Sequence, residues 1–354
     1  MFCASWRIAV LASEELLFRV AIDNIAEILK FVLPLYGERK HCHKSRPMHT
    51  GVKALSLVTV LFLFFYHSDG YCSDADLRFL FSVSRLTDGT NLRDPSGLDV
   101  SESTGDIFVA DTGSHQLRIF SADGVLLRSV GRTAGIQSPF DVAVGPDGDV
   151  YITEMNASQI TRLDSFGRLL PPLIPKSSEG PPSLLGRIFV DAANTVYVAD
   201  RSGPRVFVIS GPEQTVRKIE QTTDAESEWK VQDVTVDAKG TVYIVSSQGT
   251  AVHVYRRDGS HIRSFGRHGP KDDEFSFPVG AAIGPDGNLW IADSFRHELK
   301  VFTPGGRFLF RWGKTGMDDG ELFYPVDIAF GKEILYVLEK GASRLQAFEM
   351  PGRR

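Results

Sequence analysis

A short apolar strand with an aromatic residue at its centre recurs along the chain at a nearly constant interval. It occurs six times, and consecutive central aromatic residues lie 43, 46, 46, 47 and 46 positions apart. A fixed period of roughly 40–50 residues is typical of chains built from one repeated structural unit. The six segments are Ile107-Phe108-Val109, Val150-Tyr151-Ile152, Val196-Tyr197-Val198, Val242-Tyr243-Ile244, Leu289-Trp290-Ile291 and Leu335-Tyr336-Val337.

Each unit has the pattern of four short strands joined by tight turns. In the second unit an apolar strand at 141–144 leads into the turn Pro146-Asp147-Gly148 and then into the aromatic strand. Proline pre-sets the entry to such a turn and glycine allows a positive φ. Short strands at even spacing, without a helical period, predict a β-propeller, whose blades bury their apolar faces only against one another.

The two ends of the repeat region indicate how the ring closes. The sixth unit stops after its third strand, near Phe348, while residues 78–85 resemble the outer strands at 262–265 and 308–312. We therefore expect this N-terminal strand to complete the last blade and so tie down the chain end. The predicted fold is an all-β, six-bladed β-propeller with four-stranded blades over residues 77–350.

Several of these units resemble the NHL repeat. The resemblance is carried by residues 313–325 leading into 326–329, by residues 197–200 and by residues 108–120. The third unit departs from the pattern, with Asn194 and Gly211-Pro212 in place of Asp-Gly turns, and the fourth has Ser246 in place of an acid. The resemblance implies the propeller fold. It leaves the activity open, because the family includes binding modules, scaffolds and enzymes.

An apolar segment precedes the repeats. Residues 54–66 form a run of 13 mostly apolar residues that follows Lys53 and leads into a polar stretch at 67–75. This layout is typical of a secretory signal peptide, and the run is short of the ~20 residues that a spanning helix needs. We expect residues 48–75 to form a hydrophobic helix that acts as a signal peptide or membrane anchor. The propeller would then be exported, as a periplasmic, extracellular or outward-facing anchored protein.

Residues 1–47 are interpreted as an N-terminal extension. Either translation starts at Met48, or these residues are a cytoplasmic tail in front of an anchor.

The composition of the chain excludes some classes of partner and of binding site for the propeller. The formal net charge of -5 argues against nucleic-acid binding. The three cysteines, Cys3, Cys42 and Cys72, all precede the repeats, which excludes a disulfide or thiolate metal site within the propeller.

Alignment of the six units on their first strands predicts a ring of residues around the central channel. Two interpretations remain open. Arg187 pairs with the flanking Asp141 and Asp233 and closes the channel, with the aspartates also capping backbone N–H groups. Alternatively, Asp141, Asp233 and Asp327 are metal ligands, with calcium as the candidate cofactor. The column contains Gly97, Asp141, Arg187, Asp233, Gly280 and Asp327.

A second column of residues, acidic in five of the six units, follows the aromatic strands at the start of the next loop. We expect these acids to accept loop N–H bonds and to pair with Arg205 or Arg344. The loops at 271–275 and 317–323 are expected to add negative charge to the same face, here called the loop face. His115 and His297 occupy matching loop positions and are interpreted as loop architecture. The loop-face acids are Asp111, Glu154, Asp200, Asp293 and Glu339.

The favoured hypothesis is an exported binding or scaffold module without catalysis. Its partner would be a protein, peptide or glycan on the loop face, with no nucleic acid, and with a membrane contacted only through the N-terminal apolar segment. The alternative is a metal-dependent hydrolase or lyase that uses calcium or zinc at the channel mouth. No Ser–His–Asp or cysteine nucleophile pattern stands out in the sequence, so no catalytic residue is assigned.

Overall fold

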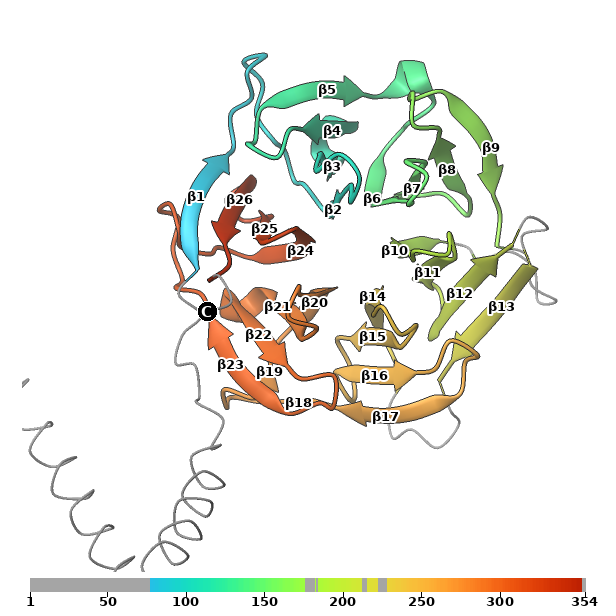
Figure 1. Ribbon diagram of the computed structural model, residues 1–354, viewed down its shortest axis with the longest axis vertical. Helices are drawn as coiled ribbons and strands as arrows, with labels where there is room; N and C mark the ends of the chain where they lie inside the picture. Colours follow the sequence, from blue (N-terminus) through green and yellow to red (C-terminus); the bar gives the residue numbers. More distant parts are fainter. Residues whose placement is uncertain (1–76, 176–181, 183, 212–214, 222–227, 352–354) are drawn as a thin grey trace, which may run out of the picture. The chain divides into compact units, whose positions relative to one another are not determined.

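Six four-stranded antiparallel sheets surround a central axis in the computed structural model of the protein (Figure 1). The structure describes residues 77–175, 182, 184–211, 215–221 and 228–351. Each of these sheets is one blade, and in five of the six the strands follow the chain from the axis outward. The six-bladed all-β fold predicted from the repeat period is therefore confirmed.

The blades are numbered here in chain order, starting from the first complete unit. Blade 1 contains β2 (Gly97–Val100), β3 (Ile107–Asp111), β4 (Gln116–Phe120) and β5 (Leu126–Val130). Blade 2 contains β6 (Pro139–Val144), β7 (Val150–Glu154), β8 (Ile160–Leu163) and β9 (Leu169–Leu173). Blade 3 contains β10 (Leu185–Val190), β11 (Val196–Asp200), β12 (Arg205–Ser210) and β13 (Thr215–Glu220).

The second half of the ring repeats this order. Blade 4 contains β14 (Val231–Val236), β15 (Val242–Ser246), β16 (Val252–Tyr255) and β17 (His261–Phe265). Blade 5 contains β20 (Pro278–Ile283), β21 (Leu289–Asp293), β22 (Glu298–Phe302) and β23 (Phe308–Trp312). Blade 6 contains β24 (Pro325–Gly331), β25 (Ile334–Glu339), β26 (Arg344–Glu349) and β1 (Arg78–Val83). Short elements connect them: β18 (Arg267–His268), β19 (Glu274–Phe275) and the 3-10 turns η2 (Thr112–Ser114), η3 (Arg132–Ala134) and η4 (Ser294–Arg296).

Strand β1 completes the last blade, as the sequence predicted. It pairs antiparallel with β26, with Phe79 opposite Phe348, and a bulge follows Phe79. The two rings also contact each other edge to face, with centroids 5.9 Å apart. The first and last described strands are thereby joined in one sheet, so blade 6 has four strands like the other five blades.

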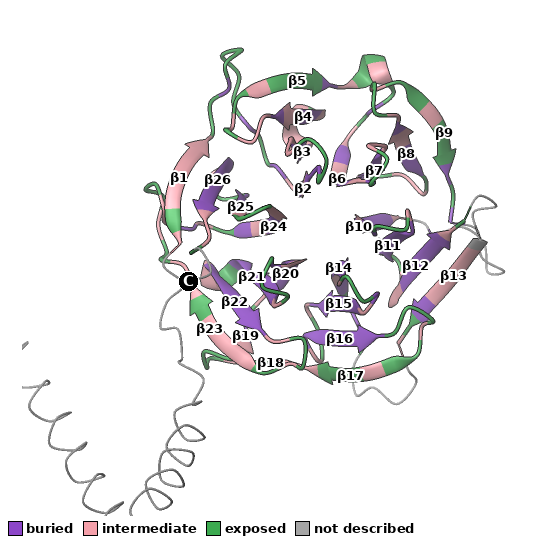
Figure 2. Ribbon diagram, in the orientation of Figure 1, coloured by how far each residue is buried: buried purple, intermediate pink, exposed green. Residues whose placement is uncertain are grey.

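The hydrophobic core lies between neighbouring blades. Tyr336 of blade 6 packs with Val100, Val109 and Phe120 of blade 1, and its hydroxyl donates to the Ala122 carbonyl of that blade (3.1 Å). Burying one such side chain contributes about 2–3 kcal/mol, so each blade depends on its neighbour. The inner strands are mostly buried, whereas the outer strands are mostly intermediate or exposed (Figure 2).

The unusual turn of the third unit has a local explanation. Asn194 takes the left-handed conformation (φ 58°) that glycine takes at Gly148 (φ 84°) in blade 2. Asparagine tolerates this region better than most residues. Its side-chain amide also donates to Asp147 Oδ2 (2.7 Å), so the substitution adds a contact between two blades.

The predicted leader at 48–75 and the extension at 1–47 lie outside the described residues, so the expected hydrophobic helix is not among the elements above. Within the described part of the chain, no helix has the length and apolar character to cross a bilayer.

Candidate functional site

The residues of the predicted axial column meet at the centre of the ring. They lie on the innermost strands β2, β6, β10, β14, β20 and β24, which surround the axis in Figure 1. The charged members are almost completely buried, with exposed fractions of 3% for Asp141, 6% for Arg187, 6% for Asp233 and 5% for Asp327. We call these four residues the axial ring.

Each aspartate of the axial ring joins its own blade to the next one. Its carboxylate accepts a hydrogen bond from the backbone N–H that follows the column position in the next blade. Asp141 binds Ile188 N–H (2.7 Å) and Asp233 binds Ala281 N–H (2.6 Å). Asp327 binds Leu98 N–H in the same way (2.8 Å). The three carboxylates therefore link blades 2 to 3, 4 to 5 and 6 to 1, which gives the ring an approximate threefold repeat.

The glycines of the column are explained by how closely neighbouring inner strands approach. A Cβ atom at Gly97 would lie 2.5 Å from the Cα atom of Asp141, and one at Gly280 would lie 2.9 Å from the Cα atom of Asp327. Both distances are below any tolerated contact with backbone. Glycine therefore lets the neighbouring aspartate approach near enough to stay within the ring.

Arg187 closes the channel by reaching across the axis. Its Nη1 atom donates to Asp141 (3.1 Å) and to Asp327 (2.5 Å), and its Nη2 atom donates to the Val326 carbonyl (2.7 Å). Asp233 was the expected second partner of Arg187. That pairing is wrong, because the long side chain extends to blade 6, which faces blade 3 across the narrow centre.

Burial dominates the protonation behaviour of the ring. Loss of solvation raises the pKa of Asp141 to about 8, against the attraction of Arg187, and the neighbouring Asp327 adds to the rise. The pKa of Asp233 is well above its usual range for the same reason, and that of Asp327 is also raised. Burial therefore disfavours ionisation of all three aspartates, and it does so against the attraction of the one guanidinium.

The axial carboxylates do not fit a calcium site. Calcium takes about 6–8 oxygen ligands, whereas these oxygens accept backbone N–H bonds between blades, and two of the aspartates also bind Arg187. Among the residues that the structure describes, no group of three or more His, Cys, Asp or Glu side chains is arranged to hold a metal ion. The contacts thus favour the interpretation of the ring as a polar network that closes the channel.

The second column of acids is buried beneath the loop face, where it positions loops. The exposed fraction is 0% for Asp293 and 0% for Glu339. Asp293 accepts the N–H groups of Ser276 and Phe277 (2.8 and 2.7 Å), and Glu339 accepts that of Phe323 (2.7 Å). The remaining members behave similarly: Asp111 accepts Arg93 N–H, Glu154 accepts Gln137 and Ser138 N–H, Asp200 pairs with Arg205 and Glu339 also pairs with Arg344. These acids add little charge to the surface.

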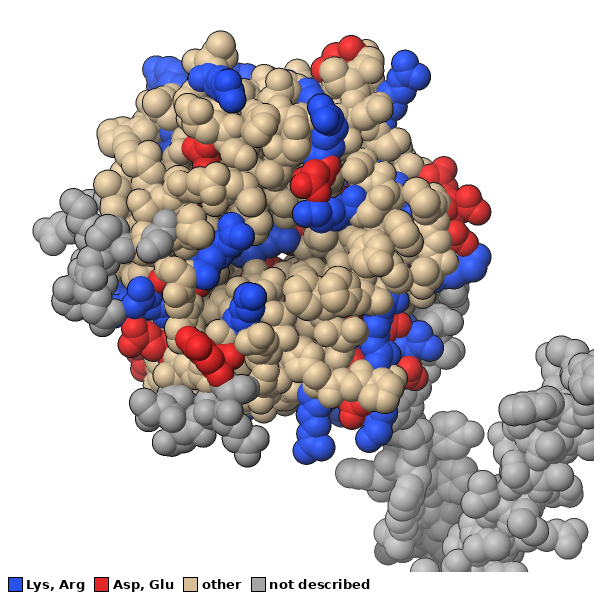
Figure 3. Space-filling model, turned by 180° about the vertical axis from the view of Figure 1, so that it is seen from behind, with Lys and Arg blue, Asp and Glu red and all other residues tan. Residues whose placement is uncertain are grey.

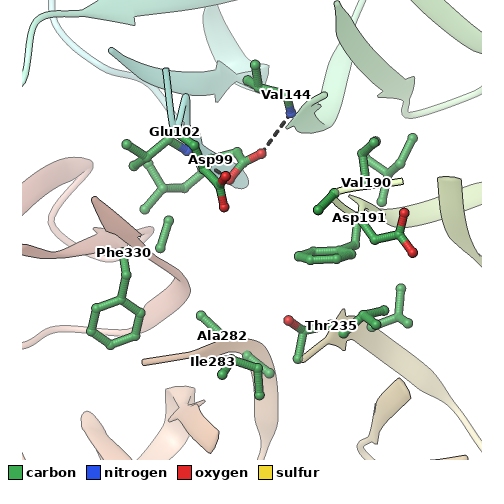
Figure 4. Close-up of a pocket in the computed structure, with 18 of the residues that line it drawn as sticks. Asp99, Glu102, Val144, Val190, Asp191, Thr235, Ala282, Ile283 and Phe330 are labelled. Carbon is green, nitrogen blue, oxygen red and sulfur yellow. Dashed lines mark hydrogen bonds between the residues drawn. The ribbon is translucent and has the colours of Figure 1, made fainter. Parts of the chain in front are cut away.

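Two pockets lie at opposite ends of the closed channel. One, of about 370 Å³, opens among the hairpins between the first and second strands, and Figure 4 shows Asp99, Glu102 and Asp191 around it with apolar neighbours. The other, also of about 370 Å³, opens on the loop face with Arg187 in its wall; we call it the loop-face pocket. Its other principal lining residues are Ser96, Phe140, Gln232, Phe277, Phe295 and Tyr324.

Exposed aromatic side chains line one side of the loop-face pocket. Phe295 is 58% exposed and stacks on Phe277, with centroids 4.5 Å apart, while Tyr324 is 39% exposed. Tyr324 has a left-handed backbone (φ 53°), which is costly for a bulky residue, by about 1–3 kcal/mol. Its N–H group donates to Nδ1 of His297 (2.9 Å), so the histidine supports the loop that presents the aromatic rings.

Cations border the same pocket. The guanidinium of Arg201 lies over the Phe140 ring, 4.7 Å from its centroid, and Lys340 pairs with Asp94 (3.1 Å) where both are about half exposed. Figure 3 shows this face, with lysine and arginine side chains around the central depression. The loops at 271–275 and 317–323 were expected to add negative charge to this face. The centre is basic because the second-column acids are buried beneath it, where they bind loop N–H groups.

The aromatic and basic residues of the pocket were missed in the sequence analysis, although their positions are regular. Phe140 and Gln232 immediately precede a column residue, and Arg201 and Lys340 immediately follow a second-column acid. Successive side chains of a strand point to opposite sides. A residue directly next to a column position therefore points to a different side from the column residue itself. That alternation is the signal that could have identified them.

The comparisons with known proteins agree with the fold. The family model of the NHL repeat matches residues 92–120 and 275–302, which include strands β2 to β4 and β20 to β22. No curated protein sequence matches the chain.

Solved structures of several functions have a similar fold. A streptogramin B lyase is 15% identical with a TM-score of 0.57, over 79% of this chain and 100% of that one. A gluconolactonase of Xanthomonas campestris is 15% identical with a TM-score of 0.56, over 79% and 99%. An auxiliary nutrient binding protein of Bacteroides thetaiotaomicron is 13% identical with a TM-score of 0.57, over 77% and 75%. At these identities the likeness shows the fold alone.

Proposed function

Because the chain carries NHL repeats in a six-bladed β-propeller, we propose that it is an exported binding module whose ligand occupies the loop-face pocket. The ligand class is a protein, a peptide or a glycan. The observation that carries the proposal is an open pocket with exposed aromatic side chains above a channel that the axial ring closes.

The energetics of the pocket support binding. An exposed aromatic ring such as Phe295 gains roughly 1.5–3 kcal/mol when a partner covers it, and a backbone held in a strained conformation at Tyr324 is typical of ligand sites. The pocket volume of about 370 Å³ is within the range of sites that hold small ligands or short segments of a larger one.

The alternative is a metal-dependent hydrolase or lyase at the channel mouth, using calcium or zinc. It is favoured by the fold likeness to a lyase and a gluconolactonase. Elemental analysis of the purified protein separates the two functions. Stoichiometric calcium or zinc that is lost in Asp327→Ala would support the enzyme, whereas a binding module should melt at the same temperature with and without a chelator.

Binding is tested with arrays of peptides and glycans. The protein and its Phe295→Ala variant are compared, with Phe166→Ala as a matched control, because Phe166 is 76% exposed in the turn between β8 and β9. We expect ligands of the native protein to be lost with Phe295→Ala and kept with Phe166→Ala. Ligands that bind all three proteins equally would show that the loop-face pocket is not the binding site.

The proposed export depends on the apolar run at 54–66, and it is tested separately. Cell fractionation and N-terminal sequencing of the native protein should place it outside the cytoplasm, starting within or after residues 48–75. A native protein that retains residues 1–47 in a cytoplasmic fraction would contradict export.

A further inference from the structure

The charged and aromatic groups at the loop-face pocket come from two pairs of opposite blades. Arg201 of blade 3 and Lys340 of blade 6 occupy matching positions, each directly after a second-column acid. Phe140 belongs to blade 2 and Phe295 to blade 5. Blades 3 and 6 face each other across the axis, as do blades 2 and 5 (Figure 1). Because Arg201 also lies over the Phe140 ring, a cation and an aromatic ring meet on one side of the pocket, with Phe295 on the opposite side.

Arg187 and Arg201 still have N–H groups that are available to a ligand. Three hydrogen bonds use three of the five N–H groups of Arg187, and the residues that the structure describes supply no acceptor for its Nε–H group. Its side chain is only 7% exposed and lines the loop-face pocket. Arg201 forms no ion pair with the described carboxylates, and its stacking on Phe140 leaves its edge free to bind an anion.

Two neutral polar side chains of the pocket, Ser96 and Gln232, already bind other groups of the protein. Ser96 Oγ donates to the Phe140 carbonyl (2.5 Å) and contacts the Thr112 hydroxyl. Gln232 Nε2 donates to Ser247 Oγ (3.0 Å). A sugar presents many hydroxyl groups, and each needs a partner when it leaves water. The cations and aromatic rings at the pocket suit a ligand with a carboxylate beside an apolar side chain.

Resting on the proposed function, we propose that the loop-face pocket binds a short acidic peptide segment. A carboxylate of the segment contacts Arg201 and the free edge of Arg187, and an adjacent aromatic or aliphatic side chain packs on the Phe277–Phe295 pair. Charge-assisted hydrogen bonds to arginine supply orientation, and aromatic burial supplies most of the remaining affinity.

The test uses fluorescein-labelled hexapeptides that contain Asp or Glu beside Phe or Leu, each paired with its Asn or Gln counterpart. Fluorescence anisotropy with the full-length protein should show that the acidic peptides bind about 10- to 100-fold more tightly than their amide counterparts. This preference should shrink in Arg201→Gln and persist in Arg128→Gln, a matched variant on the outer strand β5. Raising the salt concentration should weaken only the acidic peptides.

The other outcomes are decisive as well. Equal affinity for acidic and amide peptides would overturn the inference. An oligogalacturonate that binds through Arg201 while no peptide binds would make the pocket a glycan site, so this inference would fail and the proposed function would stand. If neither peptides nor oligosaccharides bind, and Phe295→Ala changes nothing on the arrays, the proposed function fails too.

Discussion

Replacement of Arg187 by methionine should destabilise the propeller more than any other single change of a polar residue in the ring. Methionine keeps the length of the side chain and removes its charge. Asp141 and Asp327 then lose their shared counter-ion, and the Val326 carbonyl loses its donor. Removal of one partner from a buried ion pair costs about 3–5 kcal/mol, because the other charge remains buried without compensation.

The size of this loss of stability, and its dependence on pH, follow from the ionisable groups of the axial ring. One kcal/mol corresponds to roughly 2 °C for a domain of this size, so we expect a fall in melting temperature on the order of 6–10 °C. The folded-state pKa of Asp141 is already raised to about 8, and loss of Arg187 raises it further. A carboxyl group with a raised folded pKa stabilises the fold while it is protonated. The deficit should therefore be smaller at pH 5 than at pH 8.

The assay is thermal and urea unfolding followed by circular dichroism at both pH values. The control is the double variant Arg187→Met/Asp327→Asn, which removes both charges of the short ion pair and should recover part of the loss. If Arg187→Met melts within about 1 °C of the native protein at pH 8, the axial ring carries no ion-pair network and the reasoning is wrong.

Three further predictions concern the ring and its closure. Gly97→Ala should lower the free energy of unfolding in urea by at least about 1–3 kcal/mol, since its Cβ would lie 2.5 Å from a backbone atom of Asp141. The control Gly305→Ala, whose nearest contact would be at 3.5 Å, should be almost neutral. Equal urea midpoints for the two variants would contradict the close approach of the strands. In the native protein the raised pKa of Asp141 makes the fold lose stability as the pH rises towards 8. Asp141→Asn should therefore flatten the decline of melting temperature between pH 5 and pH 8. An unchanged slope would exclude Asp141 as the titrating group. Phe348→Ala should lower the free energy of unfolding in urea by about 3–5 kcal/mol, since the buried Phe348 ring packs on Phe79 of β1. A loss below about 1 kcal/mol would show that β1 does not complete blade 6.

The repeat pattern was sufficient to predict the fold and the membership of the axial column. Equal spacing along the chain becomes equivalent position in the ring, so Asp141, Asp233 and Asp327 had to meet once six blades closed. The repeat also identified β1 as the missing outer strand, because the sixth unit ends after its third strand and residues 78–85 resemble the outer strands at 262–265 and 308–312. These are properties of periodicity, which a single sequence displays directly.

The contacts within the column could not be read from spacing. Arg187 has flexible side-chain torsions, and its choice of Asp327 over Asp233 depends on the width of the channel and on the position of the Val326 carbonyl. The charge of the loop face was misjudged for a similar reason. A sequence shows that Asp293 and Glu339 begin loops, but their burial depends on which backbone N–H groups fold over them.

The amino-acid order alone thus determined the number of blades, their strand order, the closing strand and the six positions that meet on the axis, since each follows from a regular period. Only the tertiary structure decided which charges are buried, which are paired and which remain free to bind a ligand. Burial and pairing arise from groups far apart in the chain, as when Arg187 of blade 3 meets Asp327 of blade 6, and no local pattern records that distance.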